Sequence, residues 1–410
     1  MRVLHVHKFF YPNAGAETAM FHTRTLLLEH GHEVIDFAME HPRNVDSSYS
    51  DYFAPQRDYN DSDRSLVFRT RDALSSVYSI SARRRLQRLL DDFEPDIVHM
   101  HLVYHQLTLS VVDEVAARGL PSVMTLHDFK IGCPAYELYR DGRPCTLCTT
   151  GPVENVVRHR CLKGSLPASL LAAAEARLAR TRGSYAKIDA FVAPSRFAGE
   201  VAISTGIDPR TVHVVPNFLP AEEIGEPVAA FAAAPRFFFA GRLEAVKGVR
   251  EILDAFADGD PALGTLVLAG AGGELEGDVE AAAARLPNVE YLGRLPREEV
   301  FAQLRRSRAI LMPVRWHENN PMSLLEARAI GVPVICTALG GLPDMVGDGE
   351  DGFVIPPADV AALRTAIARL AADRPLAESM GRRGNERLHR DNTPAVHYER
   401  LMAAYDAAMS

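Results

Sequence analysis

Two stretches of the chain carry charged side chains where they could hold an anion and the hydroxyls attached to it. In the first stretch, the apolar run at 237–240 predicts a buried strand, and Gly241 then permits a sharp turn before Arg242 and Lys247. Arginine grips a phosphate with a planar fork, whereas lysine acts as a compact point charge. This pair of cations at the carboxyl end of a strand would suit a diphosphate.

The second stretch is predicted to be one βαβ unit, with a strand at 309–312, a helix at 321–330 and a strand at 332–335. Asn320 precedes Pro321, which predicts an N-cap followed by proline at the first helical position. In such units, ligands lie at the carboxyl ends of strands and face helix N-termini. The start of this helix is therefore expected to offer partial positive charge and N–H groups to a phosphate.

Two glutamates flank the same helix start, Glu318 before it and Glu326 near its second turn. They would repel a bare phosphate but suit hydroxyls attached to one, as in a nucleotide sugar. Since Pro321 has no N–H, backbone contacts to the phosphate are expected from Met322 or Ser323. Taken singly, each glutamate could also be an ordinary solvated carboxylate. The spacing of the two glutamates and the predicted Asn-Pro helix start between them together favour a ligand-binding site.

GRLEAVKG at 241–248, followed by ENNPMSLLE at 318–326, resembles the donor-site pair of retaining glycosyltransferases of family 4. The resemblance implies an α/β fold of the GT-B architecture, with two Rossmann-like domains facing each other across a cleft. It implies a nucleoside-diphosphate sugar as co-substrate, same-face attack by the acceptor, and no cofactor or metal for catalysis. The donor-binding residues that it implies are Gly15, Arg242, Lys247, Leu295, Glu318, Asn319, Asn320, Met322, Ser323 and Glu326.

Within that set, Arg242 and Lys247 would stabilise the leaving diphosphate, Glu318 would bind donor-sugar hydroxyls, and Glu326 the ribose hydroxyls. The family usually carries a glycine-rich loop where this chain has Asn319, Asn320 and Pro321. Leu295 follows a predicted strand at a position where the family places backbone contacts to the base. Gly15 matches the family's first-strand glycine loop, with an ordinary turn glycine as the alternative.

A histidine, His127, follows the predicted strand at 121–126. It matches the family histidine that contacts the donor sugar and shapes the reaction centre, so the catalytic set is His127 with Arg242, Lys247 and Glu318. A core histidine is the alternative. His99, His101 and His105 could suggest a metal, but without acidic or cysteine partners nearby we favour packing or lining of the acceptor cleft.

An insertion at 133–161 carries four cysteines spaced Cys133-x11-Cys145-x2-Cys148-x12-Cys161. A Cys-x-x-Cys pair flanked by two further cysteines predicts a tetrahedral structural Zn²⁺ site that orders an insertion poor in apolar residues. Disulfides, unbound thiols and a redox pair are the alternatives. Cys336, in a predicted buried strand, is expected to be a small core residue.

At 410 residues, the length suits two domains that each bury a full core. Residues 41–72 show little periodicity and predict an irregular excursion. The predicted organisation is an acceptor-side Rossmann-like domain at 1–218 containing the insertion, a linker at 219–235, a nucleotide-sugar-binding Rossmann-like domain at 236–390, and a helix at 391–410 that packs back on the first domain.

Composition narrows the class of protein. The chain is 47% hydrophobic and 24% charged, as soluble globular proteins are, and it has no apolar run long enough to span a membrane. Residues 1–220 hold 25 basic and 25 acidic residues, so the net charge of −8 lies in the remainder, which argues against nucleic-acid binding. The start lacks a signal-peptide pattern, which predicts a cytoplasmic protein.

A helix predicted at 81–93 carries Arg83, Arg84, Arg85 and Arg88. We favour a solvated outer face. The alternative is contact with anionic lipid headgroups, which would place the protein peripherally at the inner face of the membrane.

The predicted function is that of a hexosyltransferase-type retaining enzyme in the biosynthesis of a glycan, a lipid-linked saccharide or a glycosylated metabolite. A nucleotide-sugar epimerase of the same architecture and a noncatalytic sugar-nucleotide-binding subunit are the alternatives. No residue type in the first domain selects the acceptor, and the donor's base and sugar are equally open.

Overall fold

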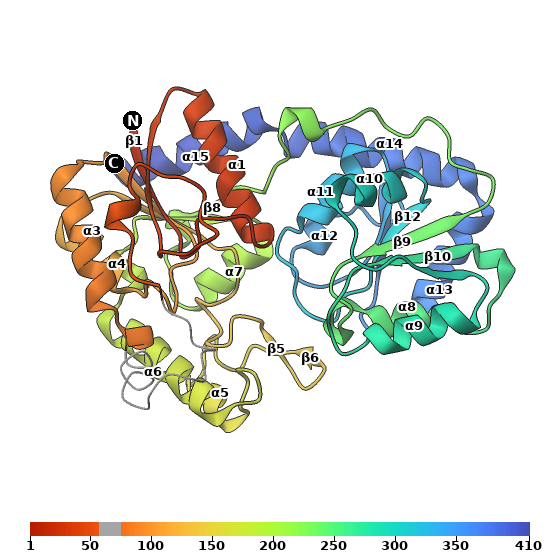
Figure 1. The fold of residues 1–410 in the computed structure, drawn as a ribbon, viewed down its shortest axis with the longest axis horizontal. Coiled ribbons are helices and arrows are strands. Elements are labelled where there is room, and N and C mark those ends of the chain that lie inside the picture. The colour runs from red at the N-terminus through yellow and green to blue at the C-terminus, as the bar shows by residue number, and fades with distance from the viewer. Residues whose placement is uncertain (57–74) are drawn as a thin grey trace. The chain divides into compact units, whose positions relative to one another are not determined.

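A computed structural model describes residues 1–56 and 75–410 (Figure 1). The predicted irregular segment at 41–72 falls outside the described residues from residue 57 onwards. The chain forms two compact units. The first comprises Met1–Leu138, Cys145–Val215 and His397–Ser410, and the second comprises Tyr139–Pro144 and Pro216–Val396.

The first unit is built on a six-stranded parallel sheet in the order β2-β1-β3-β4-β7-β8. Its central strands are short apolar runs buried along their length, as expected where helices cover both faces of a parallel sheet. The strands are β1 (Arg2–Val6), β2 (Glu33–Phe37), β3 (Ile97–Met100), β4 (Ser122–Thr125), β7 (Ala190–Ala193) and β8 (Val212–Val214). A short antiparallel hairpin of β5 (Tyr139–Arg140) and β6 (Arg143–Pro144) interrupts the insertion.

The first unit also contains helices among its described residues. They are α1 (Gly15–Glu29), α3 (Ile80–Asp92), α4 (Ser110–Ala117), α5 (Asn155–Arg158), α6 (Leu166–Arg182), α7 (Arg196–Ser204) and the last helix of the chain, α15 (Pro394–Met409). The blue α15 lies beside the red start of the chain in Figure 1, where Leu401 and Tyr405 share a core cluster with Val3 and Ile97. The carboxyl end of the chain therefore completes the core of the first unit.

The second unit repeats the plan with a parallel sheet in the order β11-β10-β9-β12-β13-β14. Its strands are β9 (Arg236–Ala240), β10 (Thr265–Ala269), β11 (Val289–Tyr291), β12 (Ala309–Met312), β13 (Val334–Thr337) and β14 (Gly352–Ile355). Its helices are α8 (Val249–Ala255), α9 (Glu276–Arg285), α10 (Arg297–Arg305), α11 (Met322–Ala329), α12 (Leu342–Met345), α13 (Val360–Ala372) and α14 (Arg374–Asp391). Phe237, Phe238 and Phe239 of β9 form the middle of its core, and Cys336 of β13 is buried there as predicted.

Two 3₁₀ turns of the described chain each end in a lysine that forms an ion pair, η2 (Tyr185–Lys187) and η5 (Ala245–Lys247). None of the helices in the described ranges combines the length and apolarity needed to cross a bilayer.

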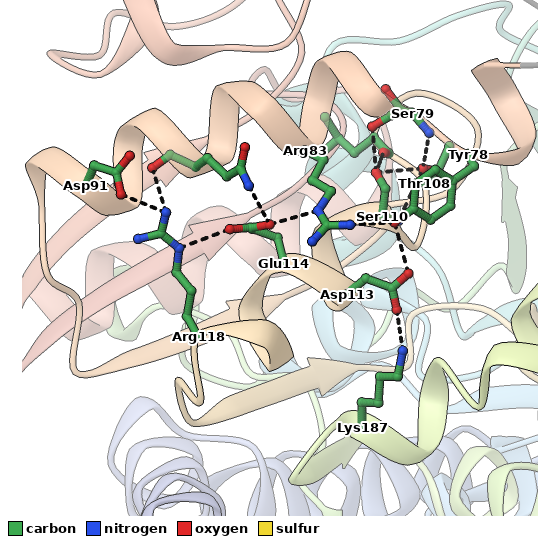
Figure 2. A network of polar contacts seen from close by, with 12 residues as sticks. Tyr78, Ser79, Arg83, Asp91, Thr108, Ser110, Asp113, Glu114, Arg118 and Lys187 are labelled. Atoms are coloured by element: carbon green, nitrogen blue, oxygen red, sulfur yellow. Dashed lines mark hydrogen bonds and ion pairs between the residues drawn. The ribbon is translucent and has the colours of Figure 1, made fainter.

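A buried polar network joins α3 to α4, which lie side by side (Figure 2). Glu114, 3% exposed on α4, accepts hydrogen bonds from Arg83 Nε at 2.8 Å, Gln87 Nε2 at 3.0 Å and Arg118 Nε at 3.0 Å. The adjacent Asp113 accepts from Tyr78 Oη and from Lys187 Nζ of η2. These bonds give two buried carboxylates the partners that their burial demands.

The network corrects part of the prediction for the arginine-rich helix. Arg84 and Arg88 are exposed, as expected of a solvated face, but Arg83 is half-buried on Glu114 and Arg85 donates to the Asp51 carbonyl at 2.7 Å. The partners of these two arginines lie about thirty residues away in the sequence, so helical periodicity did not reveal them.

Glu114→Gln should therefore destabilise the protein more than Asp91→Asn, although both side chains bond to Arg118. Asp91 is 61% exposed, so its loss should lower the free energy of unfolding by less than about 1 kcal/mol. Loss of the buried charge on Glu114 should lower it by about 1.5–3 kcal/mol. Urea denaturation of the two variants checks this, and equal losses would show that the network adds no stability through its burial.

Candidate functional site

Lys247, Trp316 and Glu318 form a compact group, called here the lysine cluster, where β9 and β12 end side by side. Lys247 Nζ lies 2.6 Å from Glu318 Oε1, and Trp316 Nε1 donates to the same oxygen at 2.8 Å. The ammonium also lies 4.7 Å from the centroid of the Trp316 ring, within cation–π range. The structure thus brings together Lys247 and Glu318, two residues 71 positions apart that were both predicted for the site.

The backbone holds the two loops that carry this cluster close together. Arg315 N–H donates to the Val246 carbonyl at 2.9 Å. Gly248 has φ of +78°, and a Cβ there would lie 2.0 Å from the Pro313 carbonyl oxygen. On the other side, Gly341 N–H donates to the Glu318 carbonyl at 2.7 Å. The position of Lys247 relative to Glu318 is therefore set by main-chain contacts as well as by the ion pair.

Arg242 lies on the same loop but bonds to a different carboxylate. Its Nη1 donates to Glu244 Oε1 at 2.7 Å, and 61% of its side chain is exposed. An exposed ion pair of this kind contributes little stability. The Arg242 guanidinium can therefore leave Glu244 and bind an incoming anion with little loss of free energy.

Glu326, on α11, is held by Arg297, a residue that the sequence did not single out. Arg297 Nη2 lies 3.0 Å from Glu326 Oε1, and the same guanidinium binds Glu223 through two further bonds. Burial raises the pKa of Glu326, while Arg297 acts to lower it. Arg297 therefore supplies a charge that keeps this half-buried carboxylate available as a hydrogen-bond acceptor.

The predicted cap of the helix after Glu318 is wrong by one residue. Pro321 is the N-cap of α11, with extended ψ of 130°, and no side chain caps the helix. The Asn320 carbonyl instead accepts a bond from Asn217 Nδ2 at 2.8 Å. Met322 and Ser323 begin the helix and Asn319 precedes it, all three half-buried.

Leu295 and Gly15 lie in different units. Leu295 follows β11 and packs partly buried against the core of the second unit. Gly15 is the exposed first residue of α1 in the first unit. The start of α1 is fixed by Glu17, which accepts from the Ala14 N–H at 3.0 Å.

Five histidines form a column on one face of the first sheet, called here the histidine column: His5 and His7, His99 and His101, and His127. Side chains alternate along a strand and β1, β3 and β4 are neighbours, so these rings share one face. His99 and His101 stack with ring centroids 4.2 Å apart, and Nδ1 of His101 shares a hydrogen bond of 2.9 Å with Nε2 of His127. His7, His101 and His127 follow the carboxyl ends of their strands, the edge at which open α/β sheets bind ligands.

The deeper end of the column is buried and electrically neutral. Burial lowers the pKa of His5 to about 3 and the pKa of His99 and His101 well below 6.5. Neither ring nitrogen of His5 has a hydrogen-bond partner among the described residues. His99 bonds to Tyr405 Oη at 2.8 Å and to Thr125 Oγ1 at 2.7 Å.

The ligand atoms of His5, His99 and His101 lie within 4.8 Å of one another, close enough to hold a metal ion. Both nitrogens of His99 already have partners, so a metal would have to displace one of them. His105, which the sequence analysis grouped with His99 and His101, lies instead 3.6 Å from Glu175. Glu175 also pairs with Lys130 at 2.7 Å. The four cysteines predicted as zinc ligands belong to the insertion between β4 and α6 and are not part of the column.

Sequence reasoning missed Trp316, Arg297, His5 and His7. Two His-x-His pairs lie at 5–7 and 99–101, and on a strand their spacing of two residues would have predicted a shared face. Trp316 is the only tryptophan of the chain and lies two residues before Glu318. Nothing in the sequence pairs Arg297 with Glu326, since that contact depends on the packing of α10 beside α11.

Two family profiles match the chain. The profile described as Glycosyltransferase Family 4 matches residues 13–223, more than half of the 410 residues, and that described as Glycosyl transferases group 1 matches residues 222–387. The chain belongs to glycosyltransferase family 4. The family resemblance predicted from the two motifs is therefore confirmed.

Among curated relatives, the D-rhamnosyltransferase WbpZ of Pseudomonas aeruginosa is 37% identical over 157 residues, 37% of this chain and 40% of its own length. The 2-deoxystreptamine glucosyltransferase of Streptomyces kanamyceticus is 26% identical over 353 residues, 80% of this chain and 84% of its own. The chain spans less than half the length of the first curated relatives that it matches.

Two solved structures show the fold. Sucrose-phosphate synthase from Thermosynechococcus elongatus aligns over 98% of this chain and 100% of its own, with a TM-score of 0.68 at 17% identity. HepE from Anabaena, in complex with UDP and glucose, aligns over 99% and 100%, with a TM-score of 0.66 at 14% identity. The predicted GT-B fold class is thus confirmed.

The buried histidines predict a loss of stability in acid that His5→Leu should reduce. An unfolded histidine takes up a proton near pH 6.5, whereas folded His5 does so only near pH 3, so stability is present above pH 6.5 and declines as the pH falls toward 3. Between pH 7 and pH 5, His5 should account for about 2 kcal/mol of lost unfolding free energy. Leucine fills the space without an unpartnered nitrogen.

Urea denaturation at pH 7, 6 and 5 measures this dependence. His389→Gln, at an exposed position on α14, is the control and should follow the native protein. If His5→Leu loses stability toward pH 5 as steeply as the native protein, His5 is not buried in its neutral form.

Proposed function

We propose that this chain is a retaining glycosyltransferase that moves a sugar from a nucleoside-diphosphate sugar to a hydroxyl acceptor. The observation that carries the proposal is the lysine cluster, in which Lys247 and Glu318 meet at the carboxyl ends of β9 and β12. A cation for phosphate and a carboxylate for hydroxyls, 2.6 Å apart, match the two halves of such a donor. Membership of family 4 supports the same assignment.

The Lys247–Glu318 ion pair suggests how the donor would enter. Without donor, the ammonium neutralises a carboxylate that is only 15% exposed. A diphosphate carries more negative charge than Glu318 and would draw Lys247 toward itself, with Arg242 leaving Glu244 to grip the same group. Glu318 would then accept hydrogen bonds from donor-sugar hydroxyls while Trp316 Nε1 continues to donate to it.

In the transfer step, the bond between the anomeric carbon and the diphosphate oxygen breaks, and the acceptor oxygen attacks on the same face. The acceptor proton passes to the departing phosphate, so that no metal or cofactor is required. Arg242, Lys247 and the Met322 and Ser323 amides at the start of α11 would stabilise the charge that develops on the diphosphate.

The remaining roles rest on the family resemblance. Glu326, held by Arg297, would bind the ribose hydroxyls, and the backbone at Leu295 would contact the base. Asn319 and Asn320 would line the loop beside the donor sugar. On the same resemblance, His127, held by His101, would contact the donor sugar.

HepE was solved with UDP and glucose, which supports a nucleotide sugar as the donor here. The proposed location of the protein is the cytoplasm, where it would be either free in solution or bound peripherally at the inner face of the membrane. The exposed Arg84 and Arg88 of α3 offer charge to anionic headgroups in the second case. The acceptor is a hydroxyl compound of a glycan, lipid-linked saccharide or metabolite.

A donor screen followed by a turnover assay tests the proposal. Thermal shift across uridine, guanosine, adenosine and thymidine diphosphate sugars identifies the donor, because a bound ligand raises the apparent stability. Release of nucleoside diphosphate is then measured with a panel of hydroxyl acceptors, and the anomeric configuration of the product is read by NMR. Retention of configuration is expected, and an inverted product would contradict the mechanism.

Arg242→Met and Lys247→Met should each lower kcat/KM by about 10²–10³-fold, the usual cost of removing one preorganised donor to developing charge. Arg250→Met, at an exposed arginine on α8, is the matched control and should keep native turnover. Free sugar released from donor alone in an altered epimeric form would identify an epimerase. Donor binding without any turnover would identify a noncatalytic subunit.

A further inference from the structure

Three rings at the buried end of the histidine column lie close enough to share one ion. His5 lies on β1, His99 lies on β3 and His101 follows it directly, and all three residues are at most 2% exposed. One ligand atom of each ring lies within 4.8 Å of the other two, so a point exists within about 2.8 Å of all three. Zinc binds imidazole nitrogen at about 2.0–2.1 Å, so each nitrogen would move by less than about 1 Å.

Most of the ring nitrogens that such an ion needs have no other partner. Both nitrogens of His5 and the Nε2 atom of His101 lack a hydrogen-bond partner within the described ranges of the chain. A buried polar atom left unpaired is costly, and nearly all such atoms in folded proteins are paired. Unpaired nitrogens gathered at one point therefore favour either a bound ion or a buried water molecule there.

His99 would exchange one hydrogen bond for the ion. Its Nδ1 bonds to Tyr405 Oη at 2.8 Å and its Nε2 to Thr125 Oγ1 at 2.7 Å. A neutral imidazole has one N–H and one lone pair, so one of these two hydroxyls donates to the ring and can rotate away from it. The net contribution of a neutral hydrogen bond is small beside that of a zinc–imidazole bond, so the exchange favours the ion.

We propose that His5, His99 and His101 bind one divalent transition-metal ion, for which Zn²⁺ is the probe. Imidazole nitrogen is a preferred ligand of such ions, and three protein ligands leave a fourth position to a water molecule. Glu17 of α1 is buried beside the column, with its Oε1 3.7 Å from Nε2 of His7. This carboxylate supplies a negative charge that would partly offset the charge of the ion.

The ion would also fix the orientation of His127. Nδ1 of His101 lies 2.9 Å from Nε2 of His127, and Nε2 of His101 is the nitrogen left for the ion. A histidine bound to metal through Nε2 keeps its proton on Nδ1, so His101 would donate to His127. Under the proposed function, the ion would thus position the histidine that contacts the donor sugar, and it would take no part in the transfer step.

Metal analysis of the full-length chain tests the proposal. Protein freed of metal with a chelator and then supplied with Zn²⁺ should carry, after gel filtration, one zinc that His5→Leu lacks. The dissociation constant of this zinc should rise by more than about 100-fold in His5→Leu, because even the outer partners of a ligand are worth about 10–100-fold. His389→Gln, at an exposed position on α14, is the matched control and should bind zinc like the native protein. Equal zinc content in all three proteins would overturn the proposal.

X-ray absorption by the zinc-loaded native protein identifies the ligands without a variant, and so covers a His5→Leu protein that does not fold. A shell of imidazole nitrogen at about 2.0–2.1 Å is expected, whereas cysteine sulfur would lie at about 2.3 Å. A shell without imidazole would overturn the proposal. Absence of bound zinc would do the same, and it would make a water molecule the partner of His5.

The acid stability of His5→Leu is compared with that of the native protein after both are freed of metal, so that result is independent of the ion. Zinc content and the ligand shell do not depend on turnover. The metal site can therefore fail these tests while the proposed transferase activity stands, and the reverse is equally measurable.

Discussion

The ion pair between Lys247 and Glu318 is the interaction on which the proposed site depends. It joins the loop after β9 to the loop after β12, and those strands are adjacent in the sheet. The contact is possible because Gly248 lets its loop pass against the Pro313 carbonyl, where any side chain would collide. The sheet order and this close approach together place a cation and a carboxylate at one point.

The other contacts of Glu318 would allow Lys247 to leave it for a phosphate. Glu318 also accepts a hydrogen bond from Trp316, and the ring of that tryptophan faces Lys247. Under the proposed function, a phosphate would draw the lysine away while the carboxylate kept the Trp316 donor, so Glu318 would not be left without a partner in a half-buried position. Arg242 on its exposed partner Glu244 can move in the same way. A resting pair of this kind would suit the proposed donor, which carries both phosphates and hydroxyls.

In the first unit, the side chains at the carboxyl ends of the central strands are histidines instead of an ion pair. The buried rings of the histidine column are uncharged, because burial opposes protonation of His5, His99 and His101. Neutral imidazoles both donate and accept hydrogen bonds, so His101 can hold His127 in one orientation. The second unit thus presents charged side chains at the carboxyl edge of its sheet, and the first unit presents neutral polar side chains at the corresponding edge of its own sheet.

Much of the fold could be predicted from the sequence, because apolar runs and glycine turns are local features. The strands that became β9, β12 and β13 lie at or within a residue or two of their predicted positions. The charged residues of the site could be named because they follow those strands directly. Their pairing was not predictable in the same way, since Glu326 meets Arg297 and Arg83 meets Glu114 only through tertiary packing.

Asn320 was predicted to be the N-cap from its neighbours in the sequence, and the structure instead has Pro321 at that position. Asparagine before proline is a good N-cap in isolation, yet Asn217 binds the Asn320 carbonyl and is itself bonded by Asn392. Pro321 then takes the extended conformation, and the helix begins one residue later. The neighbours of Asn320 in the sequence give no sign of this contact.

The central claim is that Lys247 binds the donor's diphosphate, and calorimetry tests it most directly. Titration of the native protein with the nucleoside diphosphate of its donor, and separately with the nucleoside, measures what the phosphates contribute. Two charge-assisted hydrogen bonds of about 1.5–3 kcal/mol each predict roughly 10²–10⁴-fold tighter binding of the diphosphate, and Lys247→Met should lose about half of that free-energy difference. Equal affinity for the two ligands, or an undiminished difference in the variant, would contradict the account.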